Sequence, residues 1–140
     1  MSMGGEMNVT CECGHGFRAW LWQSANVTAS PELRERILAG EMNVVKCPSC
    51  GRSFHVEMPF LYHDLAKREW IWVYPLSYEK ETGSIHNRVH QMWHNLKEKM
   101  PRDMRTILDE EYRVIVLFGM DALVYYLRGK ERQIEEAASN

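Results

Sequence analysis

Cys11-Glu12-Cys13-Gly14 and Cys47-Pro48-Ser49-Cys50-Gly51 decide how this sequence folds, because they contain all four cysteines of its 140 residues. Residues 14–46 separate the two pairs. Close spacing within each pair and a long separation between pairs is how one tetrahedral metal site is assembled from two loops. We therefore predict one structural Zn²⁺ per chain. Its four ligands would be Cys11, Cys13, Cys47 and Cys50.

Other uses of these thiols remain open at this point. Disulfide bonds require an oxidising compartment, and residues 1–6 contain neither a basic flank nor an apolar segment that would direct export. We therefore expect a cytoplasmic protein with reduced thiols. An iron-loaded site with four cysteines and redox chemistry are the alternatives to zinc. The glycine after each pair, Gly14 or Gly51, fits a tight turn whose backbone amides point at the thiolates.

The composition is that of an ordinary globular protein. Hydrophobic residues make up 45% and charged residues 26% of the chain, and no apolar stretch approaches the roughly 20 residues that span a bilayer. Lys+Arg number 17 against 19 Asp+Glu, which gives a net charge of −2. Nucleic-acid binding is not favoured by this balance, because proteins that bind the phosphate backbone carry a net basic face.

Strand patterns surround both cysteine clusters in the first half of the chain. Six runs are strand-like, and they are residues 7–10, 17–23, 43–46, 53–58, 60–62 and 69–74. Between the clusters, a short helix is indicated by Ser30 as N-cap, Pro31 in the first turn and Gly40 as the stop. We predict an α+β fold, with a zinc-ribbon-like antiparallel sheet, two metal knuckles and this short inserted helix.

The second half of the chain has a different pattern. The spacing of apolar residues predicts an amphipathic helix over residues 83–100 that ends at Pro101. Its apolar stripe consists of Ile85, Val89, Met92, Trp93 and Leu96. Residues 111–118 are rich in β-branched and aromatic residues and predict a strand, which either joins the sheet or pairs across a dimer.

A terminal helix is predicted from Met120, with Asp121 as N-cap. The residues on its apolar side are Leu123, Val124, Leu127 and Ile134. The expected organisation is a flexible N-terminus over residues 1–6, a metal-binding domain over 7–75, and a helix-strand-helix α+β extension over 76–140 that packs on or beside that domain.

Several of these motifs together resemble one family. They are Thr10-Cys-Glu-Cys-Gly, Asn26-Val, Pro31-Glu-Leu, Leu38-Ala-Gly-Glu-Met-Asn43, Lys46-Cys-Pro-Ser-Cys-Gly51 and Leu61-Tyr-His-Asp64. In this order they resemble the CpXC domain, a zinc-ribbon-like family of bacterial proteins, over about residues 7–75. The family usually has Cys-Pro-x-Cys at both clusters, whereas the first cluster here is one residue shorter and lacks the proline. The resemblance implies a metal site and a fold, but no reaction, because the family is defined by its cysteines.

Three histidines form a second candidate site. His86, His90 and His94 recur every fourth residue, so a helix places them on one ridge. Two of them could bind a metal through adjacent turns, yet no carboxylate or cysteine shares their stripe at a recognisable spacing. The alternatives are a metalloenzyme that uses this ridge, a pH-sensitive contact surface, and an ordinary solvated helix face.

Tryptophans supply a candidate binding surface. Trp20 and Trp22 lie on one face of their predicted strand, and Trp70 and Trp72 on one face of theirs. If the two strands are neighbours, the rings form one aromatic surface, which could bind a protein partner or single-stranded nucleic acid. The competing interpretation is that the helix over 83–100 covers this face as part of the core.

The sequence Tyr62-His63-Asp64 contains residue types used in acid–base catalysis. No free cysteine, serine or glycine-rich loop supplies a nucleophile or a phosphate cradle beside it. The simpler interpretation is a hairpin turn whose amides are capped by Asp64.

The function that these features favour is a non-catalytic one. Four cysteines close the coordination shell of the metal, whereas a catalytic zinc keeps one position open for water. We therefore expect a structural metal ion in a protein-interaction module, which could also form a homo-oligomer. A metalloenzyme or redox protein and a single-stranded nucleic-acid binder are the alternatives.

Overall fold

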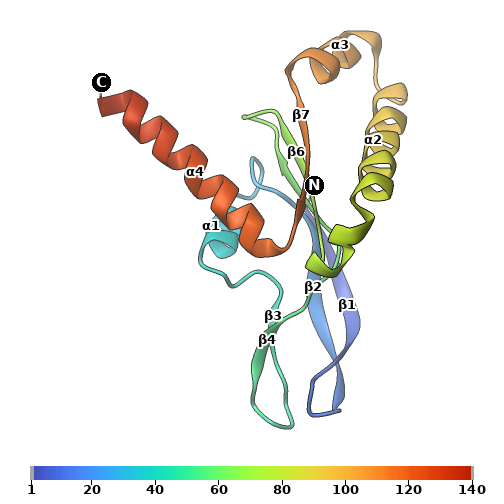
Figure 1. Cartoon of the computed structure of the whole chain (residues 1–140), viewed down its shortest axis with the longest axis vertical. Helices are drawn as coiled ribbons and strands as arrows, with labels where there is room; N and C mark the ends of the chain where they lie inside the picture. Colours follow the sequence, from blue (N-terminus) through green and yellow to red (C-terminus); the bar gives the residue numbers. More distant parts are fainter. Residues whose placement is uncertain (1, 140) are drawn as a thin grey trace.

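Five strands form one sheet through the centre of the molecule (Figure 1). The computed structural model describes the backbone of residues 2–139 and the side chains of residues 2–129. In sheet order the strands are β1 (Met3–Thr10), β2 (Gly16–Asn26), β5 (Phe60–Asp64), β6 (Glu69–Tyr74) and β7 (Arg113–Phe118). A separate two-stranded ribbon consists of β3 (Val44–Lys46) and β4 (Ser53–His55). Together with the helices, this arrangement is the predicted α+β class.

The central sheet is mixed, so the prediction of an antiparallel sheet is wrong. The pairs β1–β2 and β5–β6 are antiparallel, whereas β2–β5 and β6–β7 are parallel. Parallel neighbours need a long crossover connection, which usually contains a helix. Here α1 (Pro31–Leu38) lies between β2 and β5, while α2 (Thr82–Glu98) and α3 (Arg102–Glu111) lie between β6 and β7. The alternation of apolar residues within a strand does not reveal the direction of its neighbour.

The first strand begins earlier than predicted. β1 already starts at Met3, within the segment that was expected to be flexible, and its residues pair with β2. A Cβ on Gly4 would stand 2.8 Å from the carbonyl oxygen of Leu21 and 3.1 Å from the ring of Trp20. Glycine at this position therefore lets the indole of Trp20 lie over β1. Residues 3–6 have little strand propensity of their own, and the pairing with β2 overrides it.

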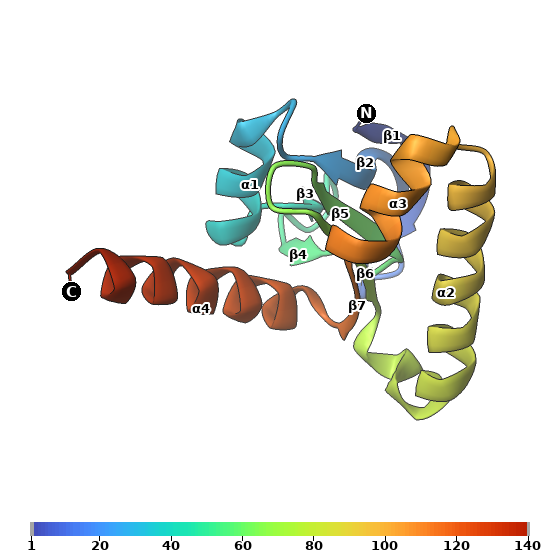
Figure 2. The ribbon, with the colours of Figure 1, turned by 90° about the horizontal axis from the view of Figure 1, so that it is seen from above.

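Helices lie on both faces of the central sheet (Figure 2), and a hydrophobic cluster lies under the helices of each face. The first cluster packs under α1 and α4 (Met120–Ser139), and the second packs under α2. β6 contributes to both, because alternate residues of a strand face opposite sides: Ile71 and Val73 belong to the first cluster, Trp70 and Tyr74 to the second. The remaining buried members of the first cluster are Ala25, Val27, Leu33, Ile37, Met42, Phe60, Tyr62, Leu123 and Leu127.

The inserted helix α1 confirms the prediction over residues 30–40. Pro31 is its first residue, and Gly40 follows its end with a left-handed φ of 74°. Ser30 occupies the N-cap position, but its side chain makes no capping hydrogen bond. The Oδ1 of Asn26 instead accepts a hydrogen bond of 3.2 Å from the backbone N–H of Thr28, within the turn that leads into the helix.

The amphipathic helix α2 and the strand β7 are also confirmed. α2 buries Ile85, Val89 and Trp93 against the sheet. β7 pairs along its whole length with β6, so it completes the central sheet within the same chain. None of the described helices is long and apolar enough to cross a lipid bilayer.

The terminal helix α4 begins at Met120, as expected, but Asp121 lies in its first turn and is not the N-cap. Leu123 and Leu127 are buried in the first cluster, with Val124 packed against it. The side chain of Ile134 lies outside the described residues.

Two elements, η1 (Leu76–Glu81) and α3, were not predicted. Pro101 ends α2 as expected, but it also occupies the N-cap position of α3. No residue of α3 is buried, and Leu108 is its contact with the second cluster. The spacing of Met104, Ile107 and Leu108 is the sequence signal that indicates this helix.

Candidate metal centre

The tips of two hairpins bring the four cysteines to one point. The turn between β1 and β2, residues 11–15, is the first knuckle, and the turn between β3 and β4, residues 47–52, is the second knuckle. Both hairpins extend toward the same end of the molecule (Figure 1). The Sγ atoms of the four cysteines all lie within 4.8 Å of one another. The structure thus groups the four residues that the sequence predicts as metal ligands.

The cysteines contact one another across the two knuckles. Cys11 Sγ lies 3.6 Å from Cys50 Sγ, and Cys13 Sγ lies 3.8 Å from Cys47 Sγ. Four thiolates that surround Zn²⁺ tetrahedrally with bonds of about 2.3 Å stand about 3.8 Å apart. All four cysteines are free, and in each knuckle the first is buried and the second exposed. The spacing and chemistry of this donor set fit a tetrahedral metal ion.

A glycine closes each knuckle with a backbone hydrogen bond. The glycine of each knuckle donates its N–H to the carbonyl oxygen of the first cysteine, from Gly14 to Cys11 and from Gly51 to Cys47, both at 2.9 Å. These glycines have left-handed φ angles of 91° and 77°, a region that disfavours residues with a Cβ. The second knuckle contains one more residue than the first, so the two turns differ in length but not in plan.

The backbone of the second knuckle stabilises the thiolate form of Cys47 even without a metal ion. The N–H of Cys50 hydrogen bonds to the side chain of Cys47, which is the largest cause that lowers the pKa of Cys47 from 9.0 to about 7, while burial acts in the opposite direction. The N–H of Ser49 adds to the lowering. Metals bind the thiolate form of cysteine, so this turn favours the protonation state that a metal needs.

One asparagine fastens the second ribbon to the central sheet. The buried side chain of Asn43 accepts a hydrogen bond of 2.8 Å from the N–H of Trp22 and donates one of 2.9 Å to the carbonyl oxygen of Trp22. Its backbone has a left-handed φ of 57°, and its own carbonyl oxygen accepts the N–H of Val56. The sequence predicts Asn43 only as the first residue of a strand, whereas it precedes β3 and adopts a left-handed conformation. Asparagine tolerates left-handed φ better than other residues with a Cβ, so an asparagine just before a strand is the sequence signal for this turn.

Side chains beside the cysteines also join the two hairpins. The rings of Phe17 on β2 and Phe54 on β4 meet edge to face, with centroids 6.3 Å apart. On the solvent side, Arg52 of the second knuckle forms an exposed ion pair with Glu12 of the first. The two hairpins are therefore in contact around the cysteines as well as through them.

The histidine ridge does not gather into a metal site. Among the side chains of residues 2–129, only the four cysteines bring together three or more potential ligands of the His, Cys, Asp or Glu type. His86, His90 and His94 lie exposed on α2. The first two rings stack with centroids 6.3 Å apart, and His94 Nε2 lies 3.0 Å from Glu98 Oε1.

The four tryptophans do not form a single surface, because β5 lies between β2 and β6. Trp22 packs against the first cluster, whereas Trp70 and Trp72 belong with the second. Trp70 is 6% exposed and lies against Trp93 of α2, with ring centroids 4.9 Å apart. Trp20 differs from the other three, since it is 56% exposed.

Tyr62, His63 and Asp64 do not converge on a reaction centre. Tyr62 is buried in the first cluster, while His63 Nε2 lies 2.8 Å from the hydroxyl of Tyr112. Asp64 Oδ1 accepts a hydrogen bond of 3.0 Å from the N–H of Lys67 in the turn between β5 and β6. This contact is the turn-capping role that the sequence predicts for Asp64.

Comparison with known families places nearly the whole fold in one of them. The CpXC family, described as CpXC protein, matches residues 9–126. The match therefore includes α2, α3, β7 and the start of α4, beyond the motifs within residues 7–75 that carry the resemblance. No curated protein and no solved structure matches the chain significantly. On the strength of this match and of its grouped cysteines, the chain belongs to the CpXC family.

Proposed function

We propose that this protein is a non-catalytic metal-binding protein in which one structural Zn²⁺, held by the four cysteines, joins the two knuckles into a zinc-ribbon-like unit. The observation that carries the proposal is the convergence of all four Sγ atoms within 4.8 Å. A tetrahedral set of four sulfur ligands is typical of zinc or of iron–sulfur chemistry. We choose zinc because the second knuckle, Cys47-Pro-Ser-Cys50, has the ligand spacing of structural zinc sites, and because the Sγ contacts of 3.6 Å and 3.8 Å fit a zinc tetrahedron.

The closed ligand set supports a structural role. With four protein ligands, no position remains for a water molecule or a substrate on the metal. A metal ion at this point would link β3 and β4, which pair through three residues each, to the longer hairpin of β1 and β2. The binding free energy of such an ion is then folding free energy for the second ribbon.

The metal content tests this proposal directly. We expect elemental analysis of the purified full chain to give one zinc per chain and no absorbance in the visible range. Cys47→Ser should lose the metal, whereas the matched variant Ser49→Ala, in the same turn, should keep it. A visible iron spectrum would overturn the identity of the metal, and full zinc retention in Cys47→Ser would overturn the site.

We also propose that the protein acts by displaying a surface to a protein partner in the cytoplasm. The support is the exposure of Trp20, whose ring lies over Gly4 on β1, and of the neighbouring Met3, at 56% and 60%. Exposed apolar patches mark interaction sites, and Trp20 and Met3 are two of the most exposed large apolar side chains described. Free cysteines fit a reducing compartment.

Two tryptophan variants separate a binding role from a packing role. Trp20→Ala should abolish capture of a partner while the free energy of unfolding changes by less than about 1 kcal/mol, because the residue is largely exposed. Trp70→Ala should lower the free energy of unfolding by about 3–5 kcal/mol, since it leaves a cavity under α2. Unfolding of the Trp20→Ala variant would show instead that this ring belongs to the core.

A further inference from the structure

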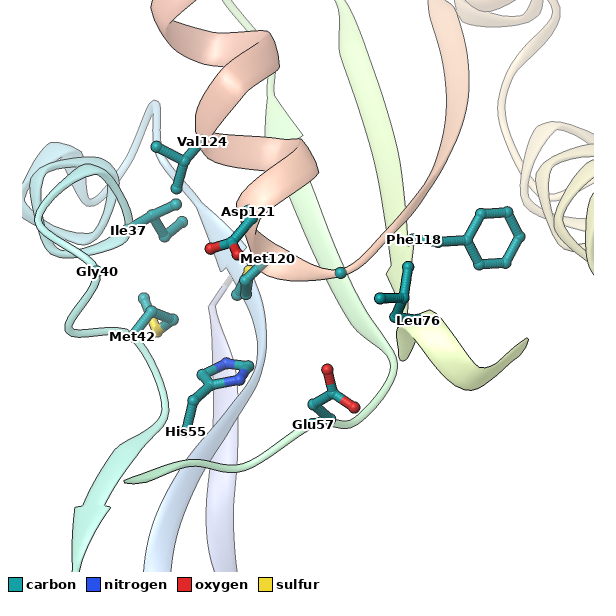
Figure 3. Close-up of a pocket in the computed structure, with 11 residues that line it drawn as sticks. Ile37, Gly40, Met42, His55, Glu57, Leu76, Phe118, Met120, Asp121 and Val124 are labelled. Carbon is teal, nitrogen blue, oxygen red and sulfur yellow. The ribbon is translucent and has the colours of Figure 1, made fainter. Parts of the chain in front are cut away.

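A cavity of about 320 Å³ lies where the second ribbon meets the base of α4 (Figure 3). Four segments of the chain build it: the end of α1 with the loop that follows, residues 55–57 after the second knuckle, Leu76 at the start of η1, and residues 118–124. All of these residues fall within the part of the chain that matches the family. The volume lies at the lower end of the range of about 300–1,000 Å³ that is typical of small-molecule sites.

One wall of the cavity is apolar. Figure 3 shows Ile37 and Met42 on one side, facing Met120 and Val124 at the start of α4. Ile37 and Met42 are buried members of the first hydrophobic cluster, so the sheet and α1 hold this wall in place. A ligand that occupies the cavity must therefore present an apolar body to this wall, mainly to the partly exposed Met120 and Val124.

The polar part of the lining carries negative charge. The ionisable residues of the cavity are His55, Glu57 and Asp121, and no lysine or arginine is among the described residues that line it. Burial lowers the pKa of His55, while Glu57 and Asp121 oppose this effect through their charges. At neutral pH the imidazole is therefore mainly uncharged, which leaves the two carboxylates to set the sign of the potential.

Neither carboxylate is neutralised by a neighbouring side chain. Within the part of the chain whose side chains are described, Glu57 and Asp121 form no ion pair and accept no hydrogen bond from a side chain. The N-terminus of α4 contributes a positive potential equivalent to about half a charge. This offsets only part of two full negative charges, so the cavity attracts cations and repels anions.

A bare metal ion does not fit these groups. Among the described residues, only the four cysteines form a group of potential metal ligands, and the three ionisable residues of the cavity do not. The apolar wall also offers nothing to a hydrated ion. The combination of an apolar wall and two carboxylates matches an organic cation better than an inorganic one.

We infer that this cavity binds a compact amphipathic cation, a small molecule with a protonated amine on an apolar body of a few carbon atoms. The ammonium group would lie toward Glu57 and Asp121, and the apolar body against Met120 and Val124, whose side chains are partly exposed in front of Ile37 and Met42. The site is distinct from the metal centre, although β4 connects the two, since His55 and Glu57 follow the second knuckle in the chain. Because the cavity is open and both carboxylates are exposed, we expect a dissociation constant in the high micromolar to millimolar range.

Three matched probes test the charge preference on the full chain as purified. They share one aromatic body and differ in charge: 2-phenylethylamine, 2-phenylethanol and 3-phenylpropionate. Titrations followed by methyl NMR should show shifts at Ile37, Met42 and Val124, with the amine binding at least about tenfold more tightly than the carboxylate. Raising the salt concentration should weaken the binding of the amine more than that of 2-phenylethanol, because salt screens the attraction between the ammonium group and the carboxylates.

Two carboxylate variants locate the ammonium group. Asp121→Asn and Glu57→Gln should each weaken amine binding about three- to tenfold and leave 2-phenylethanol unchanged. Glu110→Gln, an exposed carboxylate on α3 far from the cavity lining, is the matched control and should change neither probe. Equal affinity for the three probes, no binding of the amine, or shifts confined to another surface would each overturn the inference.

Discussion

The first knuckle ends a hairpin in which eight residues of β1 pair with β2, and β2 pairs in turn with β5 inside the central sheet. The second knuckle ends a ribbon of three residue pairs that is not part of that sheet. The two turns nevertheless present equivalent cysteines, one buried and one exposed in each. The difference shows that the sheet positions the first knuckle, whereas the second depends on its contacts with the first and on Asn43, and on the metal ion that we propose.

Metal removal should separate the two knuckles most strongly. After chelation, we expect the backbone amides of residues 44–56 to exchange at least about a hundredfold faster. The reason is that a structural zinc contributes several kcal/mol of stability to the segment that it holds. The amides of residues 3–26 should exchange less than about tenfold faster. Equal loss of protection in both hairpins, or none in either, would contradict this division of support.

Asn43 should be the next most important contribution to the second ribbon. Asn43→Ala removes two hydrogen bonds to the backbone of Trp22 and places a Cβ-bearing residue with no local hydrogen bond at a left-handed φ. We expect the free energy of unfolding to fall by about 2–4 kcal/mol in chemical denaturation. Asn43→Gly keeps the backbone conformation accessible, so it should recover about 1 kcal/mol of this loss. If Asn43→Gly recovers the whole loss, the hydrogen bonds contribute nothing.

The glycines of the two knuckles provide a smaller and more symmetrical test. Gly14→Ala and Gly51→Ala each force a residue with a Cβ into the left-handed region, at a cost of about 1–2 kcal/mol. The surroundings leave room for the methyl group in both turns, so the backbone is the main source of this cost. We expect Gly51→Ala to weaken zinc affinity about fivefold to thirtyfold in a competition titration. Gly14→Ala should weaken it less, because the hairpin of β1 and β2 holds the first knuckle from outside the turn.

The ion pair that links the knuckles should matter least. Arg52 and Glu12 are both largely exposed, and such pairs contribute about 0.2–1 kcal/mol at most. A double-mutant cycle with Arg52→Gln and Glu12→Gln should give a coupling energy below about 0.5 kcal/mol, which disappears at high salt. A larger coupling would mean that the knuckles attract each other electrostatically without the metal.

The sequence predicted local features of the fold better than long-range ones. The helix after Pro31 and the hairpin turn at Asp64 depend on signals within a few residues, and the structure contains both. The cysteine grouping is the long-range exception, because two close pairs of thiols indicate a shared site whatever the length of chain between them. The parallel neighbours of the sheet and the contact of Asn43 with Trp22 depend on segments that meet only after folding. No local pattern specifies them, because strand propensity and periodicity describe a segment and not its partner.

The aromatic residues illustrate the same limit at the candidate binding surface. Alternation along each strand placed Trp70 and Trp72 on one face, and α2 covers that face in the structure. Whether Trp20 shares a surface with Trp70 and Trp72 depends on the order of the strands. In the structure β5 lies between β2 and β6, so these tryptophans are not on neighbouring strands. Sequence alone therefore identified the residues but could not tell which ring faces solvent.

The position of β7 has a consequence for how the protein is made. This last strand pairs with β6 through six residues, from Glu69 with Arg113 to Tyr74 with Phe118. When residue 75 of the growing chain has emerged from the ribosome, all four cysteines have emerged as well. The strand β7, which covers the outer edge of β6, has not. Until residue 118 emerges, that edge lies open to other nascent chains, and chaperones that bind extended apolar segments have a defined interval in which to act.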